Sequence, residues 1–376
     1  MSISNKRDAN FDLLRIISML LIIFLHSIDH SGVLEQADVC GGETYAYVRF
    51  TYALCQVCVN CYVMLSGYYL LNSKFRVHKL VALWMEVVFY SFVLRALFMI
   101  TGQHAFSIVS LLSCFVPVLT GRYWFITIYV GLYLLFPFLN KLVWAMNKKE
   151  HTLMNICLFV LFSLSISIYP SFKGMNCGGG WGLAWFVVLY LLAAWFRLYY
   201  TPTKKKNTLA VLVAVFLCIP LIMSASQIGA KTAGIDVFQC IISNWYRYDS
   251  VPVYLMTFVL FAAFLNIRIE NSYMKKICSV APLTLGVYLI HAHADVSPWL
   301  WETLNLPQYM EYAWFPLLQL MCVVAIFIVC IAIDALRRKI LGKLENNHAV
   351  WTFCDRISTK SAMLLKNMID IKEAER

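Results

Sequence analysis

Long apolar runs separated by short polar segments dominate this sequence. A membrane-spanning α-helix needs about 20 predominantly apolar residues. Ten runs of about that length cover residues 11–28, 50–71, 80–100, 124–145, 152–169, 181–200, 208–227, 250–266, 281–300 and 313–336. Another run, 106–120, is shorter and contains Pro117, so we expect a re-entrant or interfacial segment there. The pattern predicts an all-α, polytopic membrane helical bundle with about ten transmembrane helices.

Lysine and arginine occupy alternate loops between these runs. With ten spans, the basic groups within 6–7, 74–79, 141–149, 197–206 and 268–276, and those from 337 onward, all fall on one side. Basic loops mark the cytoplasmic side, so both termini are predicted to be cytoplasmic. We assign residues 1–340 to an integral membrane domain. Residues 341–376 mix apolar and charged side chains, which predicts a cytoplasmic amphipathic tail.

The high hydrophobic content and low charged content are typical of a membrane protein, and the net positive charge follows from the same topology. The chain is 61% hydrophobic and only 14% charged, whereas soluble domains contain about 25% charged residues. Its net charge of +11 comes from cytoplasmic loops next to the lipid bilayer, not from a basic surface interleaved with aromatic residues. We therefore expect no nucleic-acid partner.

The first run, FDLLRIISMLLIIFLHSIDH (residues 11–30), contains four ionisable side chains on one helical face: Asp12, Arg15, His26 and His30. The eleven steps from Arg15 to His26 make three turns plus about 20°, and all four side chains fall within an arc of about 60°. Arg15 and His26 are about 16 Å apart along the axis. The helix is predicted to present one polar stripe.

Other polar residues lie in or at the outer edges of apolar runs, where ionisable groups are costly and usually line a functional cavity. For Arg49, Arg95 and Arg247, snorkelling to the interface is the alternative. Cys55, Cys58 and Cys61 fall within a predicted helix, which favours packing over a metal site, and no metal is expected. The outer polar residues are Arg49, Arg95, His104, Arg122, Arg247, Asp249, His291, His293 and Asp295.

Five segments, in order, resemble the acyltransferase-3 family of integral membrane O-acyltransferases. The first helix is similar to the family signature of an arginine, ten residues and a histidine, at Arg15 and His26. The others are MLSGYYLL (64–71), RYWFITIYVGLYLLFPFLN (122–140), YRYDSVPVYLMTFVLFAAF (246–264) and TLGVYLIHAH (284–293). The resemblance spans about residues 8–335, with Asp249 standing where many relatives carry asparagine.

The resemblance implies O-acyl transfer, typically O-acetyl transfer, across a bacterial cytoplasmic (inner) membrane. The donor would be cytoplasmic acyl-CoA, usually acetyl-CoA, acting as a co-substrate with no tightly bound cofactor. The carbohydrate acceptor would be a cell-surface glycan or its lipid-linked precursor, modified at a hydroxyl group on the outer side.

Chemistry suggests a role for each polar residue in such a reaction. A sugar hydroxyl needs a base, and His26 is our candidate. Arg122, or another outer arginine, could stabilise the oxyanion. Arg15, too far from His26 to reach the same carbonyl, suits the donor, with Asp12 orienting its guanidinium. We assign Lys74, Arg76 and Lys79 to the CoA phosphates, and His30, Arg247, Asp249 and His291 to acceptor binding.

The polar stripe of the first run is also compatible with a transporter. A proton-coupled transporter of a small molecule or glycan precursor would also carry Asp, Arg and His on one helix face. Transporters usually show duplicated halves, and we find no such duplication here. A receptor or scaffold would not need the His26–Arg15 stripe. Within the enzyme hypothesis, His26 either acts as a base or carries the acyl group covalently, and ping-pong kinetics would identify the covalent route.

The basic loops predict which positions a membrane-impermeant thiol reagent reaches in intact cells. Cysteines introduced at positions 147 and 205, in a background lacking reactive native cysteines, should stay unlabelled because both loops are predicted to be cytoplasmic. Cysteines at positions 36 and 230 should be labelled. Labelling at 205 in sealed cells would contradict the predicted orientation.

Overall fold

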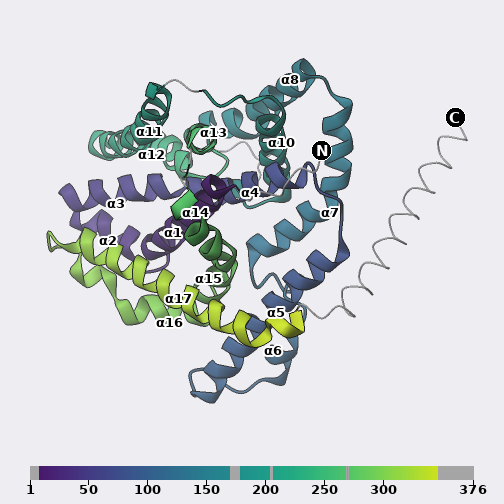
Figure 1. Cartoon of the computed structure of the whole chain (residues 1–376). Coiled ribbons are helices and arrows are strands. Elements are labelled where there is room, and N and C mark those ends of the chain that lie inside the picture. Colours follow the sequence, from purple (N-terminus) through teal and green to yellow (C-terminus); the bar gives the residue numbers. More distant parts are fainter. Residues whose placement is uncertain (1–7, 170–177, 204–205, 268, 270, 346–376) are drawn as a thin grey trace, which may run out of the picture.

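The structure, a computed structural model, describes residues 8–169, 178–203, 206–267, 269 and 271–345. Every regular element within these ranges is a helix (Figure 1). The predicted all-α class is therefore confirmed. Residues 346–376, most of the predicted amphipathic tail, lie outside the described residues. Helix α17 (Phe315–Glu345) continues past the boundary predicted at residue 340.

Eight helical stretches in the described chain are long and apolar enough to cross a membrane, or nine if one bent pair is counted as a span. They are α1 (Ala9–Asp29), α3 with α4 (Gly42–Cys55 and Val57–Leu70), α5 (Val77–Ile100), α7 (Trp124–Ala145), α8 to α9 (Lys148–Phe159 and Ser165–Ile168), α11 (Lys206–Ala233), α12 to α13 (Asp236–Ser243 and Val251–Asn266) and α17. The bent pair joins α14 (Asn271–Val280) and α15 (Thr284–His291) to α16 (Val296–Leu304). Helix α10 (Leu183–Tyr199) is apolar but shorter. Each of the ten predicted runs thus falls on helix.

One predicted span differs in shape from the prediction. The run 281–300 is not one straight helix, because α15 ends at His291 and α16 starts at Val296 after a bend of 83°. The short run 106–120 contains only α6 (Ile108–Ser113), whose Val109 side chain is exposed. This segment is too short to span a bilayer, as predicted.

Helix α1 lies at the centre of the bundle (Figure 1). It contacts α4, α13, α15 and α17, as well as α3 and the short α2 (Val33–Cys40). Its sequence contains neither glycine nor proline, so nothing interrupts the helix between Ala9 and Asp29. Leu14, Ile23 and Ile28 are fully buried. The polar stripe of α1 is thereby brought into the interior of the protein.

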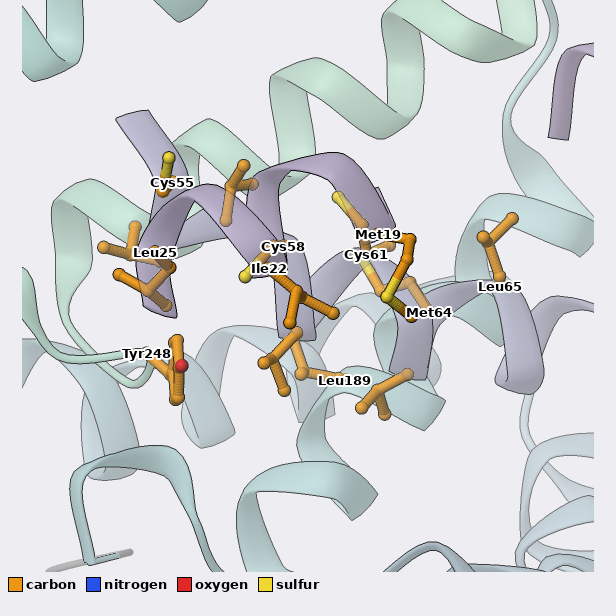
Figure 2. Packing of buried hydrophobic residues seen from close by; sticks show 14 of the residues in the cluster. Met19, Ile22, Leu25, Cys55, Cys58, Cys61, Met64, Leu65, Leu189 and Tyr248 are labelled. Atoms are coloured by element: carbon orange, nitrogen blue, oxygen red, sulfur yellow. The ribbon is translucent and has the colours of Figure 1, made fainter. Parts of the chain in front are cut away.

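The cysteine run packs against α1 and α10 (Figure 2). Cys55, Cys58 and Cys61 are free thiols with almost no exposed surface. They belong to the same apolar cluster as Ile22 and Leu189. Small sulfur-containing side chains suit such close helix contacts. The predicted packing role fits this environment.

A buried charge on α17 is satisfied by one side chain of α5 and two of α17 itself. The Asp334 carboxylate accepts hydrogen bonds from the Tyr90 hydroxyl at 2.8 Å and from the Nε atoms of Arg337 and Arg338 at 2.8 and 2.9 Å. Gly286 of α15 lies against this carboxylate: a Cβ atom added there would come within 2.4 Å of Asp334 Cγ. The glycine therefore allows α15 and α17 to approach closely.

Gly286→Ala should destabilise the protein because the added methyl group must displace the Asp334 network. Overpacking of this kind costs about 1–3 kcal/mol, so the thermal unfolding midpoint in detergent should fall. Gly229→Ala in α11 is the matched control, since a Cβ there meets nothing within 4 Å. An unfolding midpoint equal to that of the Gly229→Ala variant would contradict close packing at Gly286.

Candidate active site

His26 and His291 form the polar centre of the site. Nδ1 of His26, on α1, lies 3.1 Å from Nε2 of His291, at the end of α15. The other ring nitrogen of His291, Nδ1, lies 2.6 Å from the Val287 carbonyl oxygen one turn earlier. His291 is almost completely buried, whereas His26 is only partly buried. The two predicted site histidines are thus brought together from opposite ends of the chain.

The hydrogen bonds of His291 determine which nitrogen of His26 can act as a base. A carbonyl oxygen only accepts, so His291 Nδ1 carries the proton that is donated to Val287. In neutral His291, Nε2 is then an acceptor, and His26 Nδ1 must be the donor to it. The lone pair of neutral His26 consequently lies on Nε2. That atom has no hydrogen-bond partner among the described residues.

His30 lies one turn above His26 and extends the polar site. The two imidazole rings are stacked, with centroids 4.4 Å apart and planes 13° from parallel. His30 Nδ1 is 3.2 Å from the Ser297 hydroxyl on α16. Desolvation by the surrounding protein lowers the pKa of His30 below its ordinary value, and the Asp29 carboxylate opposes that shift. His30 is thus favoured in its neutral form at neutral pH.

A cavity of about 190 Å³, here called the His26 cavity, opens beside these histidines. Arg122, the predicted oxyanion-binding residue, also lines it. The Arg122 guanidinium donates hydrogen bonds to the Ser110 carbonyl at 3.0 Å and to the Ser113 hydroxyl at 2.5 Å. The α6 segment therefore holds this cation at the cavity. The remaining wall includes Asp29, Trp124, Trp181, Tyr248 and Tyr288.

A second cavity, of about 310 Å³ and here called the Arg15 cavity, lies at the other end of the polar stripe. Arg15 and Lys79 line it. Three side chains, Tyr62, Phe125 and Leu285, line both this cavity and the His26 cavity. The two cavities therefore share a wall inside the bundle, with His26 at one cavity and Arg15 at the other.

The predicted donor residues differ in position. Arg15 donates to the buried Asp12 carboxylate at 3.1 Å, which matches the predicted orienting role of Asp12. Lys79, on the first turn of α5, reaches the Arg15 cavity. Lys74 and Arg76 are exposed in the segment before α5. Neither of these two side chains lines the Arg15 cavity.

Arg247 and Asp249 form a bidentate ion pair with each other. The Nε and Nη2 atoms of Arg247 each donate a hydrogen bond of 3.0 Å to a different carboxylate oxygen of Asp249. Asp249 is completely buried. Neither side chain lines the His26 cavity, whereas Tyr248, the residue between them, does. We interpret the pair as a support for the backbone at Tyr248.

Several other polar residues at the outer edges also pair with one another. Arg95 Nε lies 2.9 Å from the Asp295 carboxylate in the break between α15 and α16, and His104 is 2.9 Å from the other carboxylate oxygen. Arg49 is paired with Asp38 at 3.0 Å. An ion pair thus replaces the simple snorkelling considered for Arg95 and Arg49.

Sequence reasoning did not identify the aromatic side of the His26 cavity. Trp181 follows three glycines. Trp124 and Tyr248 lie within the segments 122–140 and 246–264, next to charged residues that carry the stronger chemical signal. Their common location depends on contacts between distant segments. The GGGW pattern at 178–181 was the available signal, since consecutive glycines indicate an unusual backbone.

The fold and site define a multi-pass membrane protein with ionisable groups lining two adjacent cavities. The acyltransferase-3 family model, described as an acyltransferase domain, matches residues 8–335. The chain therefore belongs to this family and is a membrane acyltransferase. No curated protein and no solved structure matches the chain.

Proposed function

We propose that the protein transfers an acetyl group from cytoplasmic acetyl-CoA to a hydroxyl group of a carbohydrate on the opposite side of a bacterial inner membrane. The acceptor is a cell-surface glycan or its lipid-linked precursor. The family membership supports acyl transfer, whereas nothing in it favours the transporter considered above. Acetyl specificity and a glycan acceptor are part of the proposal.

The observation that carries the proposal is the meeting of the two cavities at Tyr62, Phe125 and Leu285. The Arg15 cavity, which is cationic, suits the phosphates and pantetheine arm of a CoA thioester. The His26 cavity suits a hydroxyl nucleophile. Because the spacing along α1 from Arg15 to His26 is about 16 Å, an extended donor arm is needed to bring the thioester from one group to the other.

The transfer then follows from the hydrogen bonds at His26. Its Nε2 lone pair takes the proton of the acceptor hydroxyl while that oxygen attacks the thioester carbonyl. Arg122 lies in the same cavity and stabilises the negative oxygen of the tetrahedral intermediate. Collapse of the intermediate breaks the C–S bond. The departing CoA thiolate receives the proton from His26, which restores the neutral imidazole.

The donor site is tested by titrating acetyl-CoA against the purified protein in nanodiscs. Arg15→Ala and Lys79→Ala should each weaken binding about ten- to a hundredfold, because each removes a charge-assisted hydrogen bond worth roughly 1.5–3 kcal/mol. The pair Lys74→Ala/Arg76→Ala should weaken it less, since neither residue lines the Arg15 cavity. Lys149→Ala, which removes an exposed lysine at the start of α8, is the control. Unchanged affinity in every variant would place the donor elsewhere.

The role of His26 is tested by measuring glycan acetylation in cells that lack the gene and carry a variant copy. His26→Ala and His26→Gln should both reduce acylation by about 10²–10⁴-fold, because neither side chain accepts a proton at neutral pH. His30→Ala should retain a measurable fraction. Acetyl-CoA binding and thermal unfolding verify that the variants are folded. Substantial acylation by the Gln variant would make His26 a structural hydrogen-bonding residue.

A further inference from the structure

Three aromatic rings from distant parts of the chain lie together beside His26. Trp124 starts α7, whereas Trp181 and Tyr248 precede α10 and α13. Trp124 and Trp181 are stacked, with centroids 4.6 Å apart and planes 24° from parallel. The Tyr248 ring is within 16° of parallel to Trp124 at 6.4 Å. All three line the His26 cavity, and 49% of the Trp181 surface remains exposed.

The backbone before Trp181 is shaped to reach Tyr248. Gly178, Gly179 and Gly180 have φ angles of 63°, 79° and 88°, in the region that side chains other than glycine rarely adopt. A Cβ atom on Gly180 would lie 2.5 Å from Tyr248 Cβ. The Gly179 carbonyl accepts a hydrogen bond from the Tyr248 amide at 3.2 Å. The glycine run thus permits the close approach of the two loops.

Tyr248 is also held from its other side. The Asn60 side chain, from α4, donates to the Tyr248 carbonyl at 2.9 Å and accepts from the Trp185 indole at 3.0 Å. The ion pair between Arg247 and Asp249 flanks the same residue. Because Arg247 and Asp249 pair with each other and Asn60 binds the Tyr248 carbonyl, the backbone that carries the Tyr248 ring is held in place before any ligand binds.

The rest of the cavity wall is polar and complements this aromatic group. His26, His30 and Asp29 line it from α1, and Arg122 approaches from the α6 side. Carboxylate and neutral imidazole groups accept hydrogen bonds from hydroxyl groups, and the guanidinium donates them. A ligand that matches both walls needs one face of C–H groups and an edge of hydroxyls. A sugar ring has that arrangement.

We propose that Trp181, stacked on Trp124 and backed by Tyr248, forms a carbohydrate-stacking platform, on which one ring of the acceptor lies with a hydroxyl directed to His26. The electron-rich face of an aromatic ring attracts positively polarised C–H groups, and stacking also removes apolar surface from water. This inference rests on the proposed function and specifies which wall recognises the acceptor. The half-exposed Trp181 is the ring most open to the ligand.

Saturation-transfer NMR tests the platform with full-length protein in nanodiscs. The probe is a mixture of oligosaccharides released by mild acid from surface glycans of cells lacking the gene. The wild type should transfer magnetisation to C–H protons of one sugar ring. Trp181→Leu keeps an apolar side chain but removes the π face, so binding should weaken about tenfold. Trp181→Phe should restore most of it.

Two further variants separate this inference from the proposed reaction. Trp144→Leu changes an exposed tryptophan at the far end of α7 and should bind the oligosaccharides like the wild type. His26→Gln should lose acylation yet still bind them, which separates recognition from chemistry. If His26→Gln retained acylation while Trp181→Leu lost binding, the reaction mechanism would fail and the platform would stand.

The opposite results overturn the platform. Equal oligosaccharide signals from Trp181→Leu and the wild type would exclude stacking on this ring. Weaker acetyl-CoA binding by Trp181→Leu with intact oligosaccharide signals would assign the aromatic wall to the donor. Failure of Trp181→Phe to restore binding would show that an aromatic face is not what the ligand requires.

Discussion

Polar side chains inside this apolar bundle depend on partners supplied by other helices, and this requirement aligns the elements around the site. An unsatisfied polar group away from water costs several kcal/mol in a membrane. His26 on α1 meets His291 on α15, and His291 is in turn held by the Val287 carbonyl. A shift of α1 by one residue would rotate its stripe by about 100° and break this pairing. The register of α1 is therefore constrained by the same hydrogen bond that leaves Nε2 of His26 available.

The position of α1 at the centre of the bundle explains why its two ends face different cavities. A helix in a peripheral position would expose part of its stripe to lipid, where ionisable groups are costly. Enclosure by neighbouring helices instead surrounds the stripe with protein. The shared wall of Tyr62, Phe125 and Leu285 separates a cationic end from a histidine end. Acyl transfer, the reaction of the family, requires a donor and an acceptor, so two cavities of different chemistry are consistent with it.

Charged residues near the site do not all contact a ligand. Arg247 and Asp249 neutralise each other beside Tyr248, and Arg95 neutralises Asp295 at the bend between α15 and α16. Each pair stabilises a loop that departs from helical geometry next to a cavity wall. These ion pairs thus support the site without lining its cavity. The aromatic side chains of Trp124, Trp181 and Tyr248 do line the His26 cavity, and the backbone position determines where each ring lies.

The sequence by itself determined the membrane class, the location of the helical runs and the polar face of α1, because helical periodicity and hydrophobic length are local properties. Its ordered motifs also indicated the acyltransferase family. Only the tertiary structure decided that His26 pairs with His291, that the run 281–300 bends, and that Trp124, Trp181 and Tyr248 meet at one wall. Periodicity shows which face of a helix is polar but not which distant segment that face contacts. That choice depends on the packing of residues far apart in the sequence, such as His26 and His291.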